Sequence, residues 1–95
     1  MVIGFGTITL RIHDCRSLKE KRGIIKSTIQ RIRNGFNASI AEVNYNDALT
    51  QAEIGFALVG NDARIINSKM DKLISFTENL HLAEMIDTKM EIINI

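Results

Sequence analysis

The sequence has no proline, no tryptophan and one cysteine, Cys15, among its 95 residues. One thiol cannot form an intramolecular disulfide or a multi-thiolate metal site. No Pro-rich or Ser/Gly-rich tract has the composition of a linker, so a single domain is expected over residues 1–95. The longest uncharged run, Met1–Leu10, is too short to span a bilayer and lacks the features of a secretory signal. These absences predict a cytoplasmic protein without a membrane partner.

Acidic residues are also scarce in one segment, residues 16–33, although the whole chain has a net charge of only +1. This segment holds seven of the 12 Lys and Arg residues and one of the 11 Asp and Glu residues. Its charge is therefore +6 and that of the remaining chain −5. Such an uneven distribution favours an anionic partner for one element of the structure.

Hydrophobic periodicity predicts alternating strands and helices. The expected strands are residues 2–12, 36–43, 51–59 and 85–93, and the expected helices are residues 18–33 and 63–80. Ser17 with Glu20 three residues later has the spacing of a capping box, and Asn61 or Asp62 can cap the second helix. Asn34-Gly35 can adopt a left-handed backbone and is expected to stop the first helix.

The resulting order, βαββαβ, predicts an α+β ferredoxin-like sandwich. Right-handed crossovers place both helices on one face of a four-stranded antiparallel sheet. Strand parity leaves seven mainly apolar or small residues on the open face: Ile3, Phe5, Thr7, Ala41, Val43, Ala57 and Val59. Apolar residues on an open face indicate a homodimer packed through its sheets, another protein domain, or a nucleic-acid platform.

A platform of the RNA-recognition-motif type requires stacking aromatics on the central strands. Phe56, however, is in phase with Ile54 and Leu58, on the side that the helices cover. The open face would instead carry acidic residues, namely Glu53, Asp87 and Glu91. If this protein binds RNA, we expect it to do so through the first helix.

On that helix, basic residues recur at helical spacing on a stripe roughly 20 Å long at about 1.5 Å per residue. The stripe lies opposite the expected core positions and consists of Lys19, Arg22, Lys26 and Arg33. Arg16 and Lys21 flank its start, and Arg31 flanks its end. No interleaved acidic residues neutralise it, and cations at a helix start are unfavourable unless an anion binds there. A solvated charged surface without a ligand is the alternative.

His13-Asp14-Cys15 is the only combination of residues that suggests catalysis. Consecutive residues rarely converge on one point, and a nucleophilic thiol needs a base oriented by a third group. A metal site would need more ligands than the chain offers nearby. We therefore predict no enzyme activity, no catalytic residues, no metal, no cofactor and no small-molecule substrate.

Several motifs carry a family resemblance. The segments are Arg16–Arg22 (RSLKEKR), Arg31–Asn34, Phe36–Ser39, Ala41–Val43 and Asn61-Asp62. On these segments the chain resembles the YlxP-like family, with departures at Asp47-Ala48-Leu49, where an Asp-Leu-Trp type segment is expected, and at Gly60, where Ser is commoner. The resemblance implies a small bacterial ferredoxin-like domain of unknown function. Genes of the family often lie among those for translation initiation and ribosome maturation.

Together these observations predict a small binding protein that contacts RNA or a ribosomal assembly through its basic first helix. The alternative is a homodimeric protein-interaction module that uses the open sheet face and binds no nucleic acid.

Overall fold

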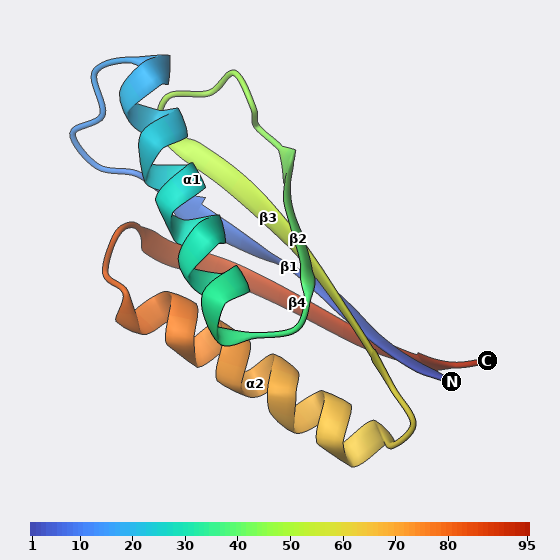
Figure 1. The fold of residues 1–95 in the computed structure, drawn as a ribbon. Coiled ribbons are helices and arrows are strands. Elements are labelled where there is room, and N and C mark those ends of the chain that lie inside the picture. The colour runs from blue at the N-terminus through green and yellow to red at the C-terminus, as the bar shows by residue number, and fades with distance from the viewer.

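Strands and helices alternate in the order that the hydrophobic patterns predict. The computed structural model describes residues 1–95, and Figure 1 shows their arrangement. The elements are β1 (Val2–Arg11), α1 (Leu18–Gly35), β2 (Ser39–Asn44), β3 (Gln51–Gly60), α2 (Ala63–Asn79) and β4 (Glu84–Asn94). Neither helix combines the length and the apolarity that a membrane-spanning helix requires.

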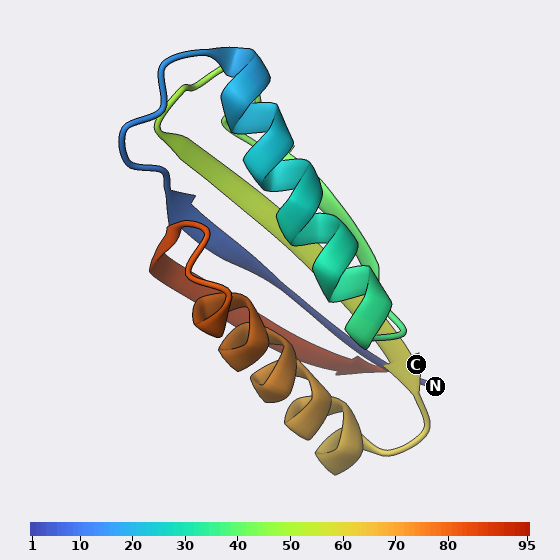
Figure 2. The same cartoon turned by 60° about the vertical axis from the view of Figure 1, so that its left-hand side comes forward.

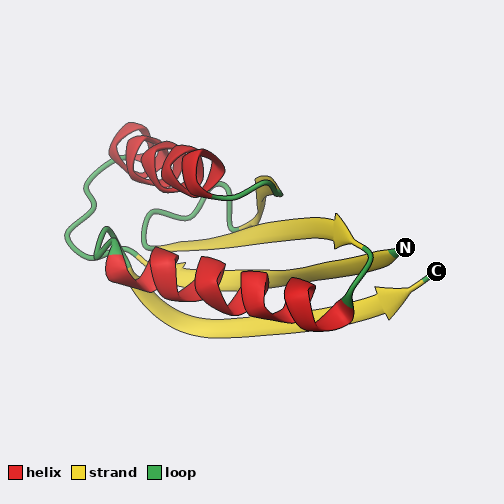
Figure 3. Ribbon diagram, turned by 60° about the horizontal axis from the view of Figure 1, so that its bottom comes forward, coloured by secondary structure: helices red, strands yellow, loops and turns green.

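The four strands form one sheet in the order β2-β3-β1-β4, and every neighbouring pair is antiparallel. Both helices lie on the same face of the sheet, α1 toward β2 and α2 toward β4 (Figure 2). This arrangement confirms the predicted ferredoxin-like α+β fold. The two chain ends lie together (Figure 3), where the Met1 amino group donates to the Ile95 carbonyl at 2.7 Å.

The core lies between the helices and the sheet. It is built mainly from aliphatic side chains of β1, β3 and both helices, with Phe56 as its only aromatic residue. Two threonines of the helices are also buried. Thr28 donates to the Ile24 carbonyl at 2.8 Å, and Thr77 donates to the Leu73 carbonyl at 2.9 Å. Each hydroxyl therefore satisfies its hydrogen-bonding requirement within its own helix.

The start of each helix is capped as the sequence predicts. The Ser17 Oγ accepts the Glu20 backbone N–H at 3.1 Å, and the Glu20 carboxylate accepts the N–H of Arg16 at 3.4 Å. In α2, the Asp62 Oδ1 accepts the Arg64 and Ile65 N–H groups. Side-chain oxygens thus occupy backbone donors that have no partner within the helix.

The end of α1 lies where the sequence predicts, at Gly35, but its backbone conformation differs from the prediction. Gly35 is helical and no glycine has a positive φ, so Asn34-Gly35 does not form a left-handed stop. Phe36 caps the helix after Gly35; it has φ −139° and still donates its N–H to Ile32 O at 2.9 Å. Its ring packs edge-on against Phe76 of α2, with centroids 5.5 Å apart. This inter-helix contact positions Phe36, and β2 begins at Ser39 instead of at Phe36.

The sheet face opposite the helices is uncovered. The strand register sets Ile3 between Val59 and Ile93, and Phe5 between Ala57 and Glu91. Other predicted members of the open face are Thr7, Ala41 and Val43; the first two pair with Gly55, and Val43 packs over it. The structure thus confirms that all seven predicted residues share this face.

Candidate anion-binding surface

Helix α1 lies beside the edge strand β2, and the two elements form a groove of about 360 Å³, the α1–β2 groove. Its lining residues from α1 are Arg22, Ile25, Lys26, Ile29, Gln30 and Arg33, and those from β2 are Ile40, Ala41 and Glu42. Ile25 and Ile40 are buried beneath it, whereas the basic side chains are exposed. The groove therefore has an apolar floor and a cationic wall.

The cations of this wall have few acidic partners. Arg22 lies 3.9 Å from Asp47, but both side chains are largely exposed, and such pairs contribute little. Lys19 and Lys26 form no ion pair. Arg33 donates to the Ile40 carbonyl at 2.8 Å, on β2, and retains further N–H donors. Most of the positive charge of the stripe is therefore unpaired and accessible.

Lys21 does not belong to this exposed surface, although its position in the basic segment predicted a phosphate contact. Its side chain is 0% exposed, and its ammonium group bonds the Glu42 carboxylate at 2.7 Å and the Tyr45 and Asn46 carbonyls at 2.7 and 3.4 Å. Three acceptors use its three donors. The prediction was wrong for Lys21 because three neighbouring groups already satisfy its charge and its hydrogen bonds.

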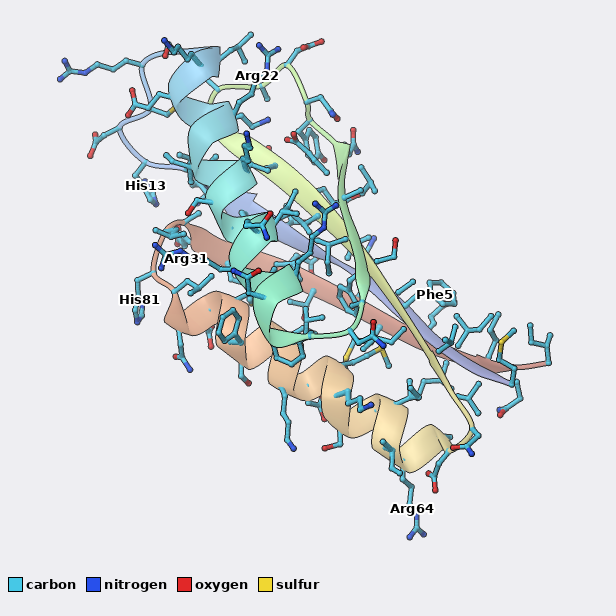
Figure 4. The ribbon with its side chains drawn as sticks, viewed as in Figure 1. Phe5, His13, Arg22, Arg31, Arg64 and His81 are labelled. Carbon is cyan, nitrogen blue, oxygen red and sulfur yellow. The ribbon has the colours of Figure 1, made fainter.

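Arg31 lies on a different side of α1 from Arg33. Two residues correspond to about 200° around a helix of 3.6 residues per turn. Figure 4 shows Arg31 on the side of α1 away from β2, toward the loop that carries His81. Arg31 lines a separate shallow hollow with Gly23, Lys26, Ser27 and Gln30. The cationic surface therefore wraps from the groove around the exposed face of α1 and is wider than a single stripe.

Arg16 precedes the helix cap and is exposed without an ion pair. Gln30, which the sequence analysis did not select, also lies in the groove. It is four residues after Lys26 and eight after Arg22, so helical spacing alone could have indicated it. Arg16, Lys19, Arg22, Lys26, Arg31 and Arg33 together are called the α1 cationic surface below.

Three acidic residues lie on the side of the sheet away from α1. Glu53 and Asp87 flank Thr9 on the uncovered sheet face, and Glu91 flanks Phe5. Phe56 is 3% exposed beneath the helices, as the sequence predicts, and is not available for stacking on that face. Three carboxylates thus lie on the opposite side of the sheet from α1, together with Lys89, while Glu42 and Asp47 lie beside α1.

His13, Asp14 and Cys15 do not form a catalytic arrangement. The His13 Nε2 lies 2.9 Å from a Glu84 oxygen, and the Cys15 thiol donates to the Ser17 carbonyl at 3.3 Å. No group of three or more His, Cys, Asp or Glu residues in the chain could hold a metal ion. His13 and Cys15 therefore contribute hydrogen bonds at the end of β1 and before α1.

Fold and surface together define a class: a small ferredoxin-like α+β protein whose first helix carries an unpaired cationic surface. Within that class, the chain belongs to the family described as "Protein of unknown function (DUF503)", which matches residues 3–90. It is 31% identical over 90 residues to the uncharacterized protein YlxP of Bacillus subtilis (strain 168), covering 95% of this chain and 98% of that protein. The predicted YlxP-like membership is confirmed.

Solved structures resemble the fold. A structural-genomics structure of protein YJCS has a TM-score of 0.59 at 14% identity, covering 97% of this chain and 99% of that one. A de novo designed protein, Foldit4, has a TM-score of 0.52 at 9% identity, covering 99% and 97%. At such low identities the likeness shows the fold alone.

Proposed function

We propose that this protein binds RNA, in a ribosomal or translation-related assembly, through the phosphate contacts of the α1 cationic surface. One observation carries the proposal: five of its six members have no acidic partner within 4.0 Å, and the sixth has only an exposed partner at 3.9 Å. Lys21, by contrast, is buried with its carboxylate. The fold pairs the basic residue that it buries and leaves all but one of the six exposed ones without an acidic partner.

An anionic ligand would remove the mutual repulsion of these cations. Lys19, Arg22 and Lys26 lie one turn apart on the same side of α1, so like charges oppose one another along the helix. A phosphate backbone presents one negative charge per nucleotide and can meet several of them at once. The acidic residues on the opposite sheet face orient the approach toward α1. The ribosomal context is supported by what the family resemblance implies.

Charge reversal on α1 tests the proposal. The variant carries Lys19→Glu, Arg22→Glu and Lys26→Glu, and its matched control carries Arg64→Glu, Lys69→Glu and Lys72→Glu on α2, where all three residues are exposed and unpaired. Both change the net charge by the same amount. Binding is measured in cells, by cross-linking and recovery of RNA, and in vitro with purified ribosomal RNA.

We expect ribosomal RNA to be recovered with the wild type and the α2 control, and to be lost with the α1 variant. Equal loss of RNA in both variants would show that binding depends on net charge and not on the α1 cationic surface. No RNA recovered with the wild type, or none bound in vitro at low salt, would overturn the proposal.

The uncovered sheet face supports a second candidate function, a homodimer or protein contact. The register groups Ile3 with Val59, which is 65% exposed, and with Ile93, which is 43% exposed. Exposed apolar side chains in one row are typical of protein contact surfaces. Phe5→Glu or Ala57→Glu should then convert a dimer to a monomer in analytical ultracentrifugation, whereas the α1 charge reversal should leave the mass unchanged. A wild type that is monomeric at all concentrations would exclude the dimer.

A further inference from the structure

Tyr45 is the only tyrosine of a chain that has no tryptophan, and it has an unusual backbone conformation. It follows β2 in the loop to β3, with φ 61°, one of three non-glycine residues with a positive φ. Bulky side chains rarely adopt this left-handed region. Residues held there against their preference occur more often at functional sites than elsewhere.

Three hydrogen bonds hold Tyr45 in this conformation. Its N–H donates to the Asn44 Oδ1 at 2.9 Å, and its carbonyl accepts the Ala48 N–H at 3.0 Å and the buried Lys21 ammonium at 2.7 Å. Lys21 is rooted in α1 and is itself fixed by Glu42. The loop is therefore tied to the start of the basic helix.

The side chain of Tyr45 is free to contact a ligand. The residue is 40% exposed, and the only aromatic pair of the protein, Phe36–Phe76, does not include it. Its anchor, Lys21, directly precedes Arg22, and Arg22 lies 3.9 Å from Asp47 of the same loop. The Tyr45 backbone is thus fixed beside the first turns of α1, and the residue that carries the aromatic ring is exposed.

We propose that Tyr45 stacks on an unpaired base of the RNA whose phosphates the α1 cationic surface binds. This inference rests on the proposed function and narrows its ligand to single-stranded or loop RNA. Bases in an A-form duplex are stacked within the helix and are not accessible to a side chain, whereas unpaired bases stack on aromatic rings. Arg22 and its neighbours would hold the adjoining phosphates.

The sole tyrosine provides a direct readout, because protein fluorescence comes from Tyr45 without interference from tryptophan. The probes are an unstructured RNA 12-mer, a hairpin with an open loop, and a blunt duplex of matched length. We expect the first two to quench Tyr45 emission on binding and the duplex to leave it unchanged. Affinities are measured in parallel through a dye on the RNA.

Two substitutions at Tyr45 distinguish the effect of losing the aromatic ring from an effect on folding. Tyr45→Leu should weaken binding of the 12-mer by about tenfold, within the range that alanine substitution gives for one stacked base. Tyr45→Phe keeps the ring and should bind within about twofold of the wild type on the same grounds. Leu49→Ala, at another exposed apolar residue of this loop, is the matched control and should bind as the wild type does.

The outcomes distinguish the two proposals. One outcome would overturn the stacking role alone. In it, the wild type binds RNA in a salt-sensitive way and α1 charge reversal abolishes this binding, but binding does not change Tyr45 emission and Tyr45→Leu binds as tightly as the wild type. Equal affinity for the duplex would do the same. A wild type that binds ribosomal RNA but none of the probes would also overturn the stacking role alone, and one that binds neither would overturn both proposals.

Discussion

Lys21 and Glu42 form a buried ion pair, with their charged atoms 2.7 Å apart, between the first turns of α1 and the edge strand β2. The Lys21 side chain is fully buried and that of Glu42 is 15% exposed. Residues 21 positions apart are thereby joined, and the same ammonium holds two carbonyls of the β2–β3 loop. One member of the basic segment thus has a structural role, and its neighbours remain exposed.

Lys21→Met should strongly destabilise the fold. The substitution fits the apolar stem but leaves the Glu42 carboxylate without its cation, and breaking one side of a buried pair typically costs about 3 to 5 kcal/mol. We expect a loss near the lower end, about 3 kcal/mol, because Glu42 retains some solvent access. Urea unfolding followed by circular dichroism measures this loss.

The same substitution at Lys19 is the control for Lys21. Lys19 is exposed and unpaired, so Lys19→Met should change the free energy of unfolding by no more than about 0.5 kcal/mol. Equal effects of the two variants would contradict the role assigned to the buried pair.

Gly23→Ala should stabilise the protein. Gly23 is exposed inside α1, and a Cβ there would meet nothing within 4 Å. Alanine is favoured over glycine in a helix interior by about 1 kcal/mol. The midpoint of thermal unfolding should therefore rise. An unchanged or lower midpoint would show that a methyl group at position 23 meets neighbouring atoms.

Gly4→Ala should have the opposite effect. A Cβ at Gly4 would clash with the Ile66 side chain and lie 2.9 Å from the Met70 sulfur, because α2 packs closely on β1 at this point. Overpacking of this kind typically costs about 1 to 3 kcal/mol. Chemical denaturation of Gly4→Ala and Gly23→Ala side by side tests the two directions, and a stabilised Gly4→Ala would be inconsistent with the close packing.

RNA affinity should depend steeply on salt. The logarithm of the association constant should fall with the logarithm of the salt concentration by about 0.7 per phosphate neutralised on a single strand. Lys26→Ala should reduce this slope by about 0.7, the contribution of one contact. Lys69→Ala on α2 should leave the slope unchanged. Fluorescence anisotropy across a salt series provides the data, and a slope near zero for the wild type would remove the electrostatic basis of binding.

Much of the architecture could be predicted from local patterns. The cap at Ser17 and the start of α1 at Leu18 were located correctly, because side-chain oxygens and helix starts are neighbours in the chain. The cap at Asp62 follows the same rule. The predicted left-handed conformation at Asn34-Gly35 was wrong, since neither residue has a positive φ. Phe36 caps the helix there and packs against Phe76, 40 residues further along the chain, a contact that local patterns do not reveal.

Local patterns predicted only part of the arrangement of the basic residues in segment 16–33. Helical spacing grouped Lys19, Arg22, Lys26 and Arg33, and the last three of these line the α1–β2 groove. It did not separate Lys21, because its acceptors come from β2 and the following loop. The sequence also did not predict the conformation of Tyr45, whose carbonyl accepts a long-range hydrogen bond from the Lys21 ammonium group.

By itself, the sequence determined the order of strands and helices, the two sheet faces and the concentration of positive charge in residues 16–33. These features follow from residue periodicity and composition, which act over a few positions of the chain. Only the tertiary structure decided which of those charges are neutralised and which are exposed. The reason is that desolvation and ion pairing depend on groups that folding brings together, here Glu42 and the Tyr45 carbonyl around Lys21.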